Sequence, residues 1–421
     1  MAVLALTCEL HAGRDLLGAK AWSIIEMLRH GIPVPPAFVL TTDECGRYHD
    51  SGGTIDDEVL RQLPAAMSEL EGVTGRTFGG GERPLLVSVR SGAPTSLPGM
   101  MDTVLNLGMT DDVQVSLAAA TGSSDYAADT RRRFEEQFEK VVGRPAPGDP
   151  WDQLHAAIAA VFESWMSDRA VHFRAEHGIP ETSGTAVTVQ AMVFGNLDER
   201  SGTGVLFTRD PTGASEHHYG EWLPQRQGED VVSGWLDPLP VEAMKETVPD
   251  AHAQLIEIAA HLDHSAGTAQ DIEFTVESGR LWLLQCRGAK VASAGARPSG
   301  APGADDATAA VLAEGRTACP GVVIGVIVTD VDEAEARALD GEDIILTRPV
   351  TCTDDVRAMS VVVGILTEIG GATSHAAVVS RELGVPCIVG VGEGVLGALE
   401  GRSVTLDATR GRVLEVVPRE T

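Results

Sequence analysis

Cysteines, aromatic residues and long apolar runs are all scarce in this sequence. The 421 residues include six cysteines without CxxC or CxxH spacing, so we expect no zinc site or disulfide framework and a cytoplasmic location. Aromatic residues make up 4% of the chain, which predicts an aliphatic core. No basic segment precedes the first apolar residues, and no apolar run approaches the length of a membrane span. These absences predict a soluble intracellular protein.

Positive charge is also scarce. Lys and Arg total 32 against 61 Asp and Glu, which gives a net charge of −29. Such a surface argues against binding to nucleic acid or to an anionic membrane. Any phosphate site must therefore be built locally, from a few Arg and Lys side chains, backbone N–H groups and Mg²⁺.

The composition changes abruptly once along the chain. Residues 291–310 are mostly small residues, Gly and Pro with almost nothing to bury. This is typical of a flexible linker with a root-mean-square span of roughly 25 Å, although a surface loop is the alternative. We predict an α/β protein, with a larger region of mixed helices and strands at 1–290 before the linker and a smaller α/β domain at 311–421 after it.

Periodicity supports this division. Segment 18–32 has the spacing of an amphipathic helix that ends at Gly31, and 151–179 predicts one or two helices. Short apolar runs rich in β-branched residues predict strands on both sides of the linker. These strands are expected at 84–90, 185–194, 203–209, 272–276, 280–286, 321–329, 343–347, 361–366 and 403–408.

The stretch GGATSHAAVVSRELGVPCIVG, residues 370–390, is the most informative segment. Gly370 and Gly371 permit a tight turn and a close approach of backbone or phosphate. Thr373 or Ser374 can cap a helix that begins there, and the Gly-Val-Pro sequence can end it.

His375 follows this turn in the first turn of the predicted helix. Unpaired N–H groups and the helix dipole favour an anion at that position. Imidazole is mostly neutral at pH 7, so a ring nitrogen is available as a nucleophile. These properties suit a histidine that carries a phosphoryl group; a histidine that only caps the helix is the alternative.

Two strands predicted near 272–276 and 280–286 carry polar side chains at every second position. Asp271 and Glu273 point to one face of their strand, and so do Gln285 and Arg287 on the next. Two carboxylates on one face need a cation, and Mg²⁺ that bridges phosphate oxygens is the natural choice. A strand with a polar exposed face is the alternative.

The 370–390 motif resembles the phosphohistidine motif of the PEP-utilising enzymes, which include pyruvate phosphate dikinase and PEP synthase. The resemblance implies that His375 is a covalent phosphoryl carrier on a swivelling domain. The first 290 residues resemble the nucleotide-binding region of pyruvate phosphate dikinase. The resemblance implies an ATP-grasp fold whose two α+β lobes, at about 1–185 and 186–290, clamp ATP.

The resemblance also implies roles for individual residues of the first lobe. Segment 16–42 places Lys20 on a phosphate-contacting lysine, although Ala19 replaces a family glycine. Segment 84–108 places Arg90 on a phosphate-binding arginine, in the form found in the dikinases. The residues implied in the loop that covers the phosphates are Ser96, Gly99 and Met100.

In the second lobe, the resemblance implies an adenine pocket along Gln190–Val193, which includes Met192 and Val193. It places Glu221 and the Glu229–Asp230 pair near the ribose or the closing loop. It also implies that Asp271 and Glu273 bind Mg²⁺, and that Gln285 and Arg287 complete the γ-phosphate site. Thr373 matches a regulatory phosphorylation site of some relatives; we interpret it as a helix cap.

Full-length dikinases continue into a barrel that binds pyruvate or PEP, whereas this chain stops at Thr421. The resemblance therefore implies a phosphotransferase in which ATP, with phosphate rather than water as second substrate, phosphorylates His375 and releases AMP and pyrophosphate. The acceptor is then a small molecule or lies on another chain. A subunit of a split dikinase and an inactive ATP-binding regulatory module are the alternatives.

Overall fold

The computed structural model describes residues 2–95, 97, 101–212, 217–228, 230, 236, 238–289 and 309–416. Ser96, Gly99, Met100, Glu229 and nearly all of the predicted linker lie outside these residues. The chain divides into two compact units. The first unit comprises Met1–Leu197 and Trp282–Cys286, and the second comprises Asp198–Leu281 and Arg287–Thr421. Within the described ranges, no helix is long and apolar enough to cross a membrane.

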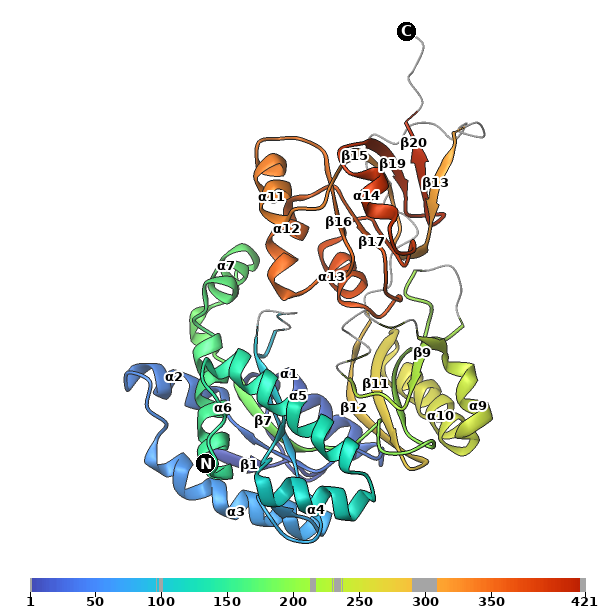
Figure 1. Cartoon of the computed structure of the whole chain (residues 1–421). Helices are drawn as coiled ribbons and strands as arrows, with labels where there is room; N and C mark the ends of the chain where they lie inside the picture. The colour runs from blue at the N-terminus through green and yellow to red at the C-terminus, as the bar shows by residue number, and fades with distance from the viewer. Residues whose placement is uncertain are drawn as a thin grey trace. The chain divides into compact units, whose positions relative to one another are not determined.

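The first unit contains an antiparallel sheet in the order β1-β2-β7-β5-β6. Figure 1 labels β1 and β7 of this sheet. The predicted strand at 185–194 is confirmed as β7, and the one at 84–90 is divided between β4 and β5. The strands of this unit are β1 (Val3–Ala5), β2 (Ala37–Leu40), β3 (Thr77–Phe78), β4 (Pro84–Leu85), β5 (Val87–Gly92), β6 (Thr103–Leu107) and β7 (Ala186–Ala191).

Helices of the first unit pack on this sheet, with α1 against β5 and β7. The predicted helix at 18–32 is confirmed as α1, and the segment 151–179 forms the two helices α6 and α7. The helices are α1 (Arg14–Arg29), α2 (Thr42–Asp50), α3 (Asp57–Thr74), α4 (Asp111–Thr121), α5 (Ser124–Val142), α6 (Pro150–Ser164), α7 (Asp168–His177) and the 3-10 turn η1 (Glu181–Ser183).

The second unit begins with most of a sheet in the order β10-β9-β8-β11-β12; residues 282–286 of β12 belong to the first unit. The expected strands at 203–209, 272–276 and 280–286 are confirmed as β8, β11 and β12. The elements of this part are β8 (Gly202–Phe207), β9 (Tyr219–Pro224), β10 (Leu239–Pro240), η2 (Val241–Ala243), α9 (Met244–Thr247), α10 (Pro249–Ala266), β11 (Gln270–Glu277) and β12 (Arg280–Gly288).

A second sheet of this unit has the order β13-β20-β19-β15-β16-β17-β18-β14. Its edge strands β13 and β14 are separated in sequence by Gly315 alone. The elements are β13 (Val311–Glu314), β14 (Arg316–Cys319), β15 (Val322–Val328), α11 (Val331–Leu339), β16 (Ile344–Arg348), η3 (Thr353–Asp355), α12 (Val356–Val361), β17 (Gly364–Thr367), α13 (His375–Leu383), β18 (Cys387–Val389), α14 (Val395–Leu399), β19 (Ser403–Asp407) and β20 (Arg412–Glu415).

The core of this second sheet is aliphatic, as the composition predicts. Ile327, Ile345, Leu366 and Leu406 are fully buried in one cluster. One predicted strand is partly wrong, because residue 361 ends helix α12 and the strand begins at residue 364. A short apolar run does not distinguish a buried helix from a buried strand.

Gly18 sets the position of the helix that carries Lys20. It lies inside α1 with φ 73° and ψ 162°, so the helix is kinked there. A Cβ atom at Gly18 would lie 1.7 Å from the carbonyl oxygen of Gly92. The N–H of Ala19 donates to the carbonyl of Ala93 at 3.0 Å. Only glycine allows this close approach of α1 to the end of β5.

Gly18→Ala should therefore destabilise the first unit. The backbone conformation costs about 1–3 kcal/mol for any other residue, and the overlap adds about 1–3 kcal/mol. We expect a lower urea midpoint by fluorescence. Gly46→Ala is the matched control, because Gly46 is exposed inside α2 with nothing within 4 Å of a Cβ atom; it should gain about 0.5–1 kcal/mol. Equal midpoints for the two variants would contradict this role for Gly18.

Candidate functional site

A polar group in the first unit centres on Arg90 of β5. Its guanidinium donates to the side-chain oxygen of Gln190 at 3.5 Å and to that of Gln285 at 3.3 Å. Lys20 on α1 donates to the carbonyl of Ser91 at 2.5 Å. The structure thus brings together Lys20, Arg90, Gln190 and Gln285, which the sequence analysis proposes as phosphate-site or nucleotide residues. We call these four residues the first polar group.

Gln190 serves to orient Arg90. It is buried on β7, where its amide nitrogen donates to the carbonyl of Pro35 at 3.0 Å, and this leaves the amide oxygen directed at Arg90. Met192 continues the strand pairing through its N–H to the carbonyl of Leu86 at 2.9 Å, and Met192 and Val193 are half-buried. An adenine pocket along these residues remains a prediction.

A second polar group, in the second unit, contains Asp271 and Glu273 of β11 and Arg287 of β12. Arg287 donates through Nε to Asp271 at 2.9 Å and through Nη1 to Glu382 of α13 at 3.5 Å. Burial acts to lower the pKa of Arg287, but the three carboxylates outweigh it and raise that pKa. The guanidinium therefore stays charged at this half-buried position.

Asp271 and Glu273 suit a Mg²⁺ ion that also binds phosphate. They lie two residues apart on β11, so both side chains point to the same face. In the described part of the chain, no three His, Cys, Asp or Glu side chains are grouped closely enough to hold a metal. Mg²⁺ commonly takes one or two carboxylates and completes its shell with water and substrate phosphates. The pair fits that use better than a metal cage built from protein alone.

His375 is the first residue of α13, as the sequence predicts. Its Nδ1 lies 3.0 Å from the hydroxyl oxygen of Thr351, while its Nε2 is buried and has no hydrogen-bond partner in the part of the chain that the structure describes. Burial lowers the pKa of His375, so the ring is neutral at pH 7. In the tautomer whose Nδ1–H donates to Thr351, the lone pair is on Nε2.

Thr351 is a residue that the sequence analysis missed. It follows β16 by three residues, and the loop that leads to His375 follows β17. These strands are parallel neighbours, so their carboxyl ends meet at one edge of the sheet. The strand order would have pointed to Thr351, but the order was not known from the sequence.

Ser374 is the N-cap residue of α13, as expected, but its side chain makes no capping hydrogen bond, and its buried hydroxyl has no partner among the described residues. The Thr373 hydroxyl donates instead to the carboxylate of Glu221, on β9. That carboxylate also accepts the N–H groups of Ala372 at 2.9 Å and Thr373 at 3.1 Å. The Glu221 carboxylate on β9 thus satisfies the backbone N–H donors next to the start of α13. The predicted helix end is confirmed, with Gly384 left-handed at φ 71°.

The two glycines of the motif allow this arrangement. Gly370 has φ 123°, and a Cβ atom on Gly371 would lie 2.3 Å from a carboxylate oxygen of Glu221. Of the Glu229–Asp230 pair, only Asp230 is described. It accepts the N–H of Gln227 at 3.0 Å in a turn.

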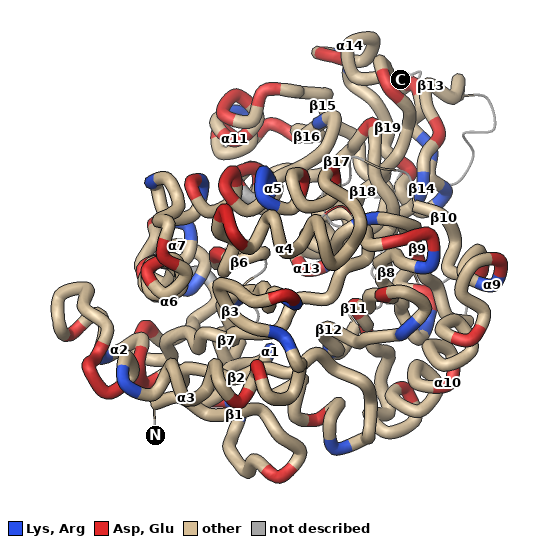
Figure 2. The backbone as a smooth tube through the Cα atoms, turned by 60° about the horizontal axis from the view of Figure 1, so that its bottom comes forward, with Lys and Arg blue, Asp and Glu red and all other residues tan. Residues whose placement is uncertain are grey.

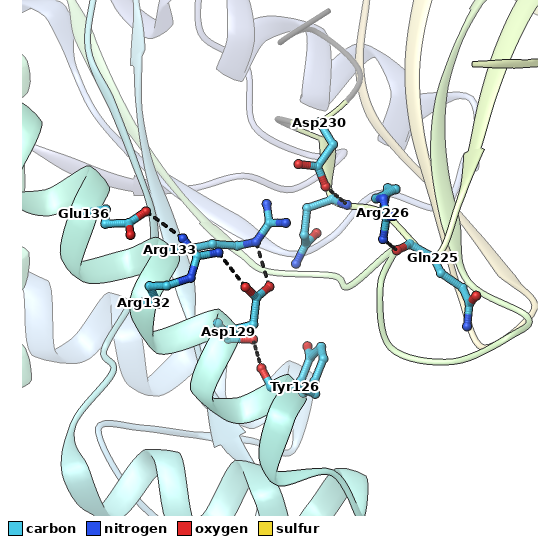
Figure 3. Close-up of polar contacts among 10 residues, drawn as sticks. Tyr126, Asp129, Arg132, Arg133, Glu136, Gln225, Arg226 and Asp230 are labelled. Carbon is cyan, nitrogen blue, oxygen red and sulfur yellow. Dashed lines mark hydrogen bonds and ion pairs between the residues drawn. The ribbon is translucent and has the colours of Figure 1, made fainter. Parts of the chain in front are cut away.

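Basic residues are interspersed with acidic ones along the chain (Figure 2). The run Arg131–Arg133 on α5 has the densest positive charge, yet each arginine is paired. Asp129 accepts from Arg132 at 2.6 Å and from Arg133 at 2.8 Å (Figure 3), and Arg131 pairs with Asp111 and Glu135. The charge of this run is thus compensated locally.

Two family models match the chain. The model described as pyruvate phosphate dikinase, AMP/ATP-binding domain, matches residues 53–249. The model described as PEP-utilising enzyme, mobile domain, matches residues 340–411. The first range contains Arg90 and Glu221, and the second contains His375.

The chain is also similar to proteins named pyruvate, phosphate dikinase. The Rhizobium meliloti protein is 36% identical over 96% of this chain and 56% of its own length. The Clostridium symbiosum protein is 36% identical over 95% of this chain and 56% of its own length. The chloroplastic protein of Zea mays is 38% identical over 90% of this chain and 48% of its own length. The chain spans about half the length of the curated relatives it matches.

The buried ring of His375 should titrate below the ordinary histidine pKa of 6.5. The unfolded chain then binds this proton more tightly than the folded one, so acidification below about pH 6.5 destabilises the fold through His375. The midpoint is measurable by NMR from the Cε1–H resonance, assigned by its loss in His375→Ala. A midpoint at or above 6.5 would contradict the burial argument.

Proposed function

We propose that this chain, which belongs to the pyruvate phosphate dikinase family and carries its AMP/ATP-binding and mobile domains, is a phosphotransferase that moves a phosphoryl group from ATP to His375. The observation that carries the proposal is the state of the His375 ring. Its Nδ1 is held by Thr351, its Nε2 has no hydrogen-bond partner among the described residues, and the residue stands at a helix start.

The chemistry follows from that ring. The Nε2 lone pair attacks the β-phosphorus of ATP, the bond from that phosphorus to the oxygen it shares with the α-phosphorus breaks, and AMP leaves with that oxygen. Inorganic phosphate then attacks the outer phosphorus and departs as pyrophosphate, which leaves phosphohistidine. Thr351 accepts Nδ1–H in this scheme and so stabilises the positive charge that develops on the ring.

The start of α13 also favours the phosphorylated state. The dipole of a helix places a partial positive charge of about +0.5 at its amino end, which stabilises an anion there by about 0.3–2 kcal/mol. His375 is the first residue of α13. The phosphoryl group therefore adds its negative charge at the end of α13 that favours an anion.

The polar groups supply the remaining charges that phosphoryl transfer needs. We assign phosphate binding to Lys20, Arg90, Gln285 and Arg287, since fixed cations and N–H donors offset the charge on the phosphate oxygens. Mg²⁺ held by Asp271 and Glu273 would bridge phosphate oxygens and neutralise part of their charge. The further nucleotide contacts that we assign are Gln190, Met192, Val193 and Glu221 and the loop residues Ser96, Gly99 and Met100.

The phosphoryl group then leaves on the mobile domain. We assign residues 311–421 as the carrier and 291–310 as the linker that allows it to swivel. The final acceptor is a small molecule or a site on another chain. Pyruvate, which appears in the names of the relatives, is the first acceptor to try.

The chain incubated with Mg²⁺, phosphate and ATP labelled at the β-phosphorus should acquire one acid-labile label on His375. His375→Ala should acquire none, because the substitution removes the ring that we assign as the phosphoryl acceptor. The label is measured by scintillation counting after gel filtration and located by peptide mass spectrometry.

The matched control is His264→Ala, which removes another histidine from a helix of the second unit and should label normally. Label that persists in His375→Ala, or that survives acid, would overturn the proposal. The compound that removes the label from the wild-type chain identifies the acceptor.

A further inference from the structure

The carboxylate of Glu221 is almost completely enclosed, with the residue 2% exposed on β9. It accepts four hydrogen bonds. Three come from the loop that precedes His375: the N–H of Ala372, the N–H of Thr373 and the Thr373 hydroxyl. The fourth comes from the Tyr219 hydroxyl at 2.8 Å. A buried carboxylate with these neutral donors is a specific contact between the sheet of β8–β12 and the His375 loop.

The loop is shaped to receive this anion. Gly371 lacks the Cβ atom that would overlap the carboxylate. Ser374 is 4% exposed, and its hydroxyl has no partner. The N–H groups that the carboxylate binds lie just before α13, whose amino end attracts negative charge. The loop is therefore an anion site that Glu221 occupies.

The other end of α13 also contacts the β8–β12 sheet, but differently. The guanidinium of Arg381 lies 5.2 Å from the ring centroid of Phe207 on β8. Glu382 accepts from Arg287 at 3.5 Å. Of these two ends, the amino end is the one where negative charge on His375 would meet a buried carboxylate.

We propose that Glu221 is a latch that holds the His375 domain against the β8–β12 sheet, and that phosphorylation of His375 opens it. The second half rests on the function proposed above. A phosphoryl group adds about −1.5 to −2 charges at a residue two positions after Thr373. Two anions then compete for one helix end whose partial charge is about +0.5. The covalently attached phosphoryl group stays, so the Glu221 contact is the one that breaks.

With this latch, the movement of the carrier domain depends on whether His375 is phosphorylated. An empty His375 stays docked on the nucleotide-binding sheet, and a phosphorylated His375 departs. Release frees the donors of Ala372 and Thr373 for the phosphoryl group, and it frees the Glu221 carboxylate for the ribose of the next ATP. The contact thus couples the chemical state of His375 to the position of its domain.

The latch is testable by hydrogen–deuterium exchange of the full chain, read by mass spectrometry on peptides that cover residues 368–378. Glu221→Gln replaces a charged acceptor of several hydrogen bonds by a neutral amide with one acceptor oxygen. We expect the amides of Ala372 and Thr373 to exchange at least tenfold faster. Glu242→Gln is the matched control, because Glu242 lies in the same part of the chain with an exposed side chain; exchange at 372–373 should not change.

The release is tested without ATP, by phosphorylating His375 with phosphoramidate, which transfers its phosphoryl group and leaves ammonia. Phosphate NMR determines the fraction of phosphohistidine, and phosphoramidate-treated His375→Ala is the control. Exchange at 372–373 should accelerate in the phosphorylated chain only. His375→Glu, which puts a permanent anion at the same helix position, should shift exchange in the same direction.

Exchange that Glu221→Gln leaves unchanged would overturn the latch. Exchange that neither phosphorylation nor His375→Glu accelerates would overturn the release. Because phosphoramidate bypasses ATP, these outcomes do not depend on the labelling reaction. If ATP fails to label His375 while phosphoramidate accelerates exchange, the proposed function is wrong and the latch stands.

Discussion

The amino end of α13 is the position on which the account of this protein depends. Backbone N–H groups just before the helix cannot bond within it, and they are buried, so they need an acceptor from outside. Glu221 supplies that acceptor from β9. His375 begins the helix next to these donors, with one ring nitrogen held by Thr351 and the other left without a partner. These N–H groups that lack an acceptor within the helix thus account for the buried carboxylate of Glu221 and for Gly371, which leaves room for it. They also account for the place of His375 beside an anion site, where we propose that it carries a phosphoryl group.

In a chain with a net charge of −29, the two arginines of the polar groups are held in different ways. Arg90 is directed by neutral amide oxygens of Gln190 and Gln285. Arg287 is instead held by carboxylates, which raise its pKa against the effect of burial. Neutral amide groups therefore fix the direction of the Arg90 side chain, whereas negatively charged carboxylates fix the Arg287 side chain. Both give a defined geometry to a side chain that is long and flexible in solution.

Local pattern was sufficient for features whose causes are local. The helix over residues 375–383, its glycine end and the polar alternation of Asp271 and Glu273 all follow from short-range spacing and from residue type. Long-range partners were not accessible in this way. Thr351 meets His375 because two parallel strands end at one sheet edge. The expected capping bond from Ser374 is absent because Glu221, 151 residues before Ala372, accepts the neighbouring N–H groups instead. Residue spacing in the sequence does not reveal such a long-range contact.

The central claim is that His375 accepts the phosphoryl group on Nε2 because Thr351 occupies Nδ1. Proton–phosphorus correlation NMR on the chain phosphorylated with ATP, Mg²⁺ and phosphate distinguishes the two ring positions directly. The account predicts a single phosphohistidine, on His375, with phosphorus bonded to Nε2. Phosphorus on Nδ1, or the absence of any phosphohistidine, would contradict it.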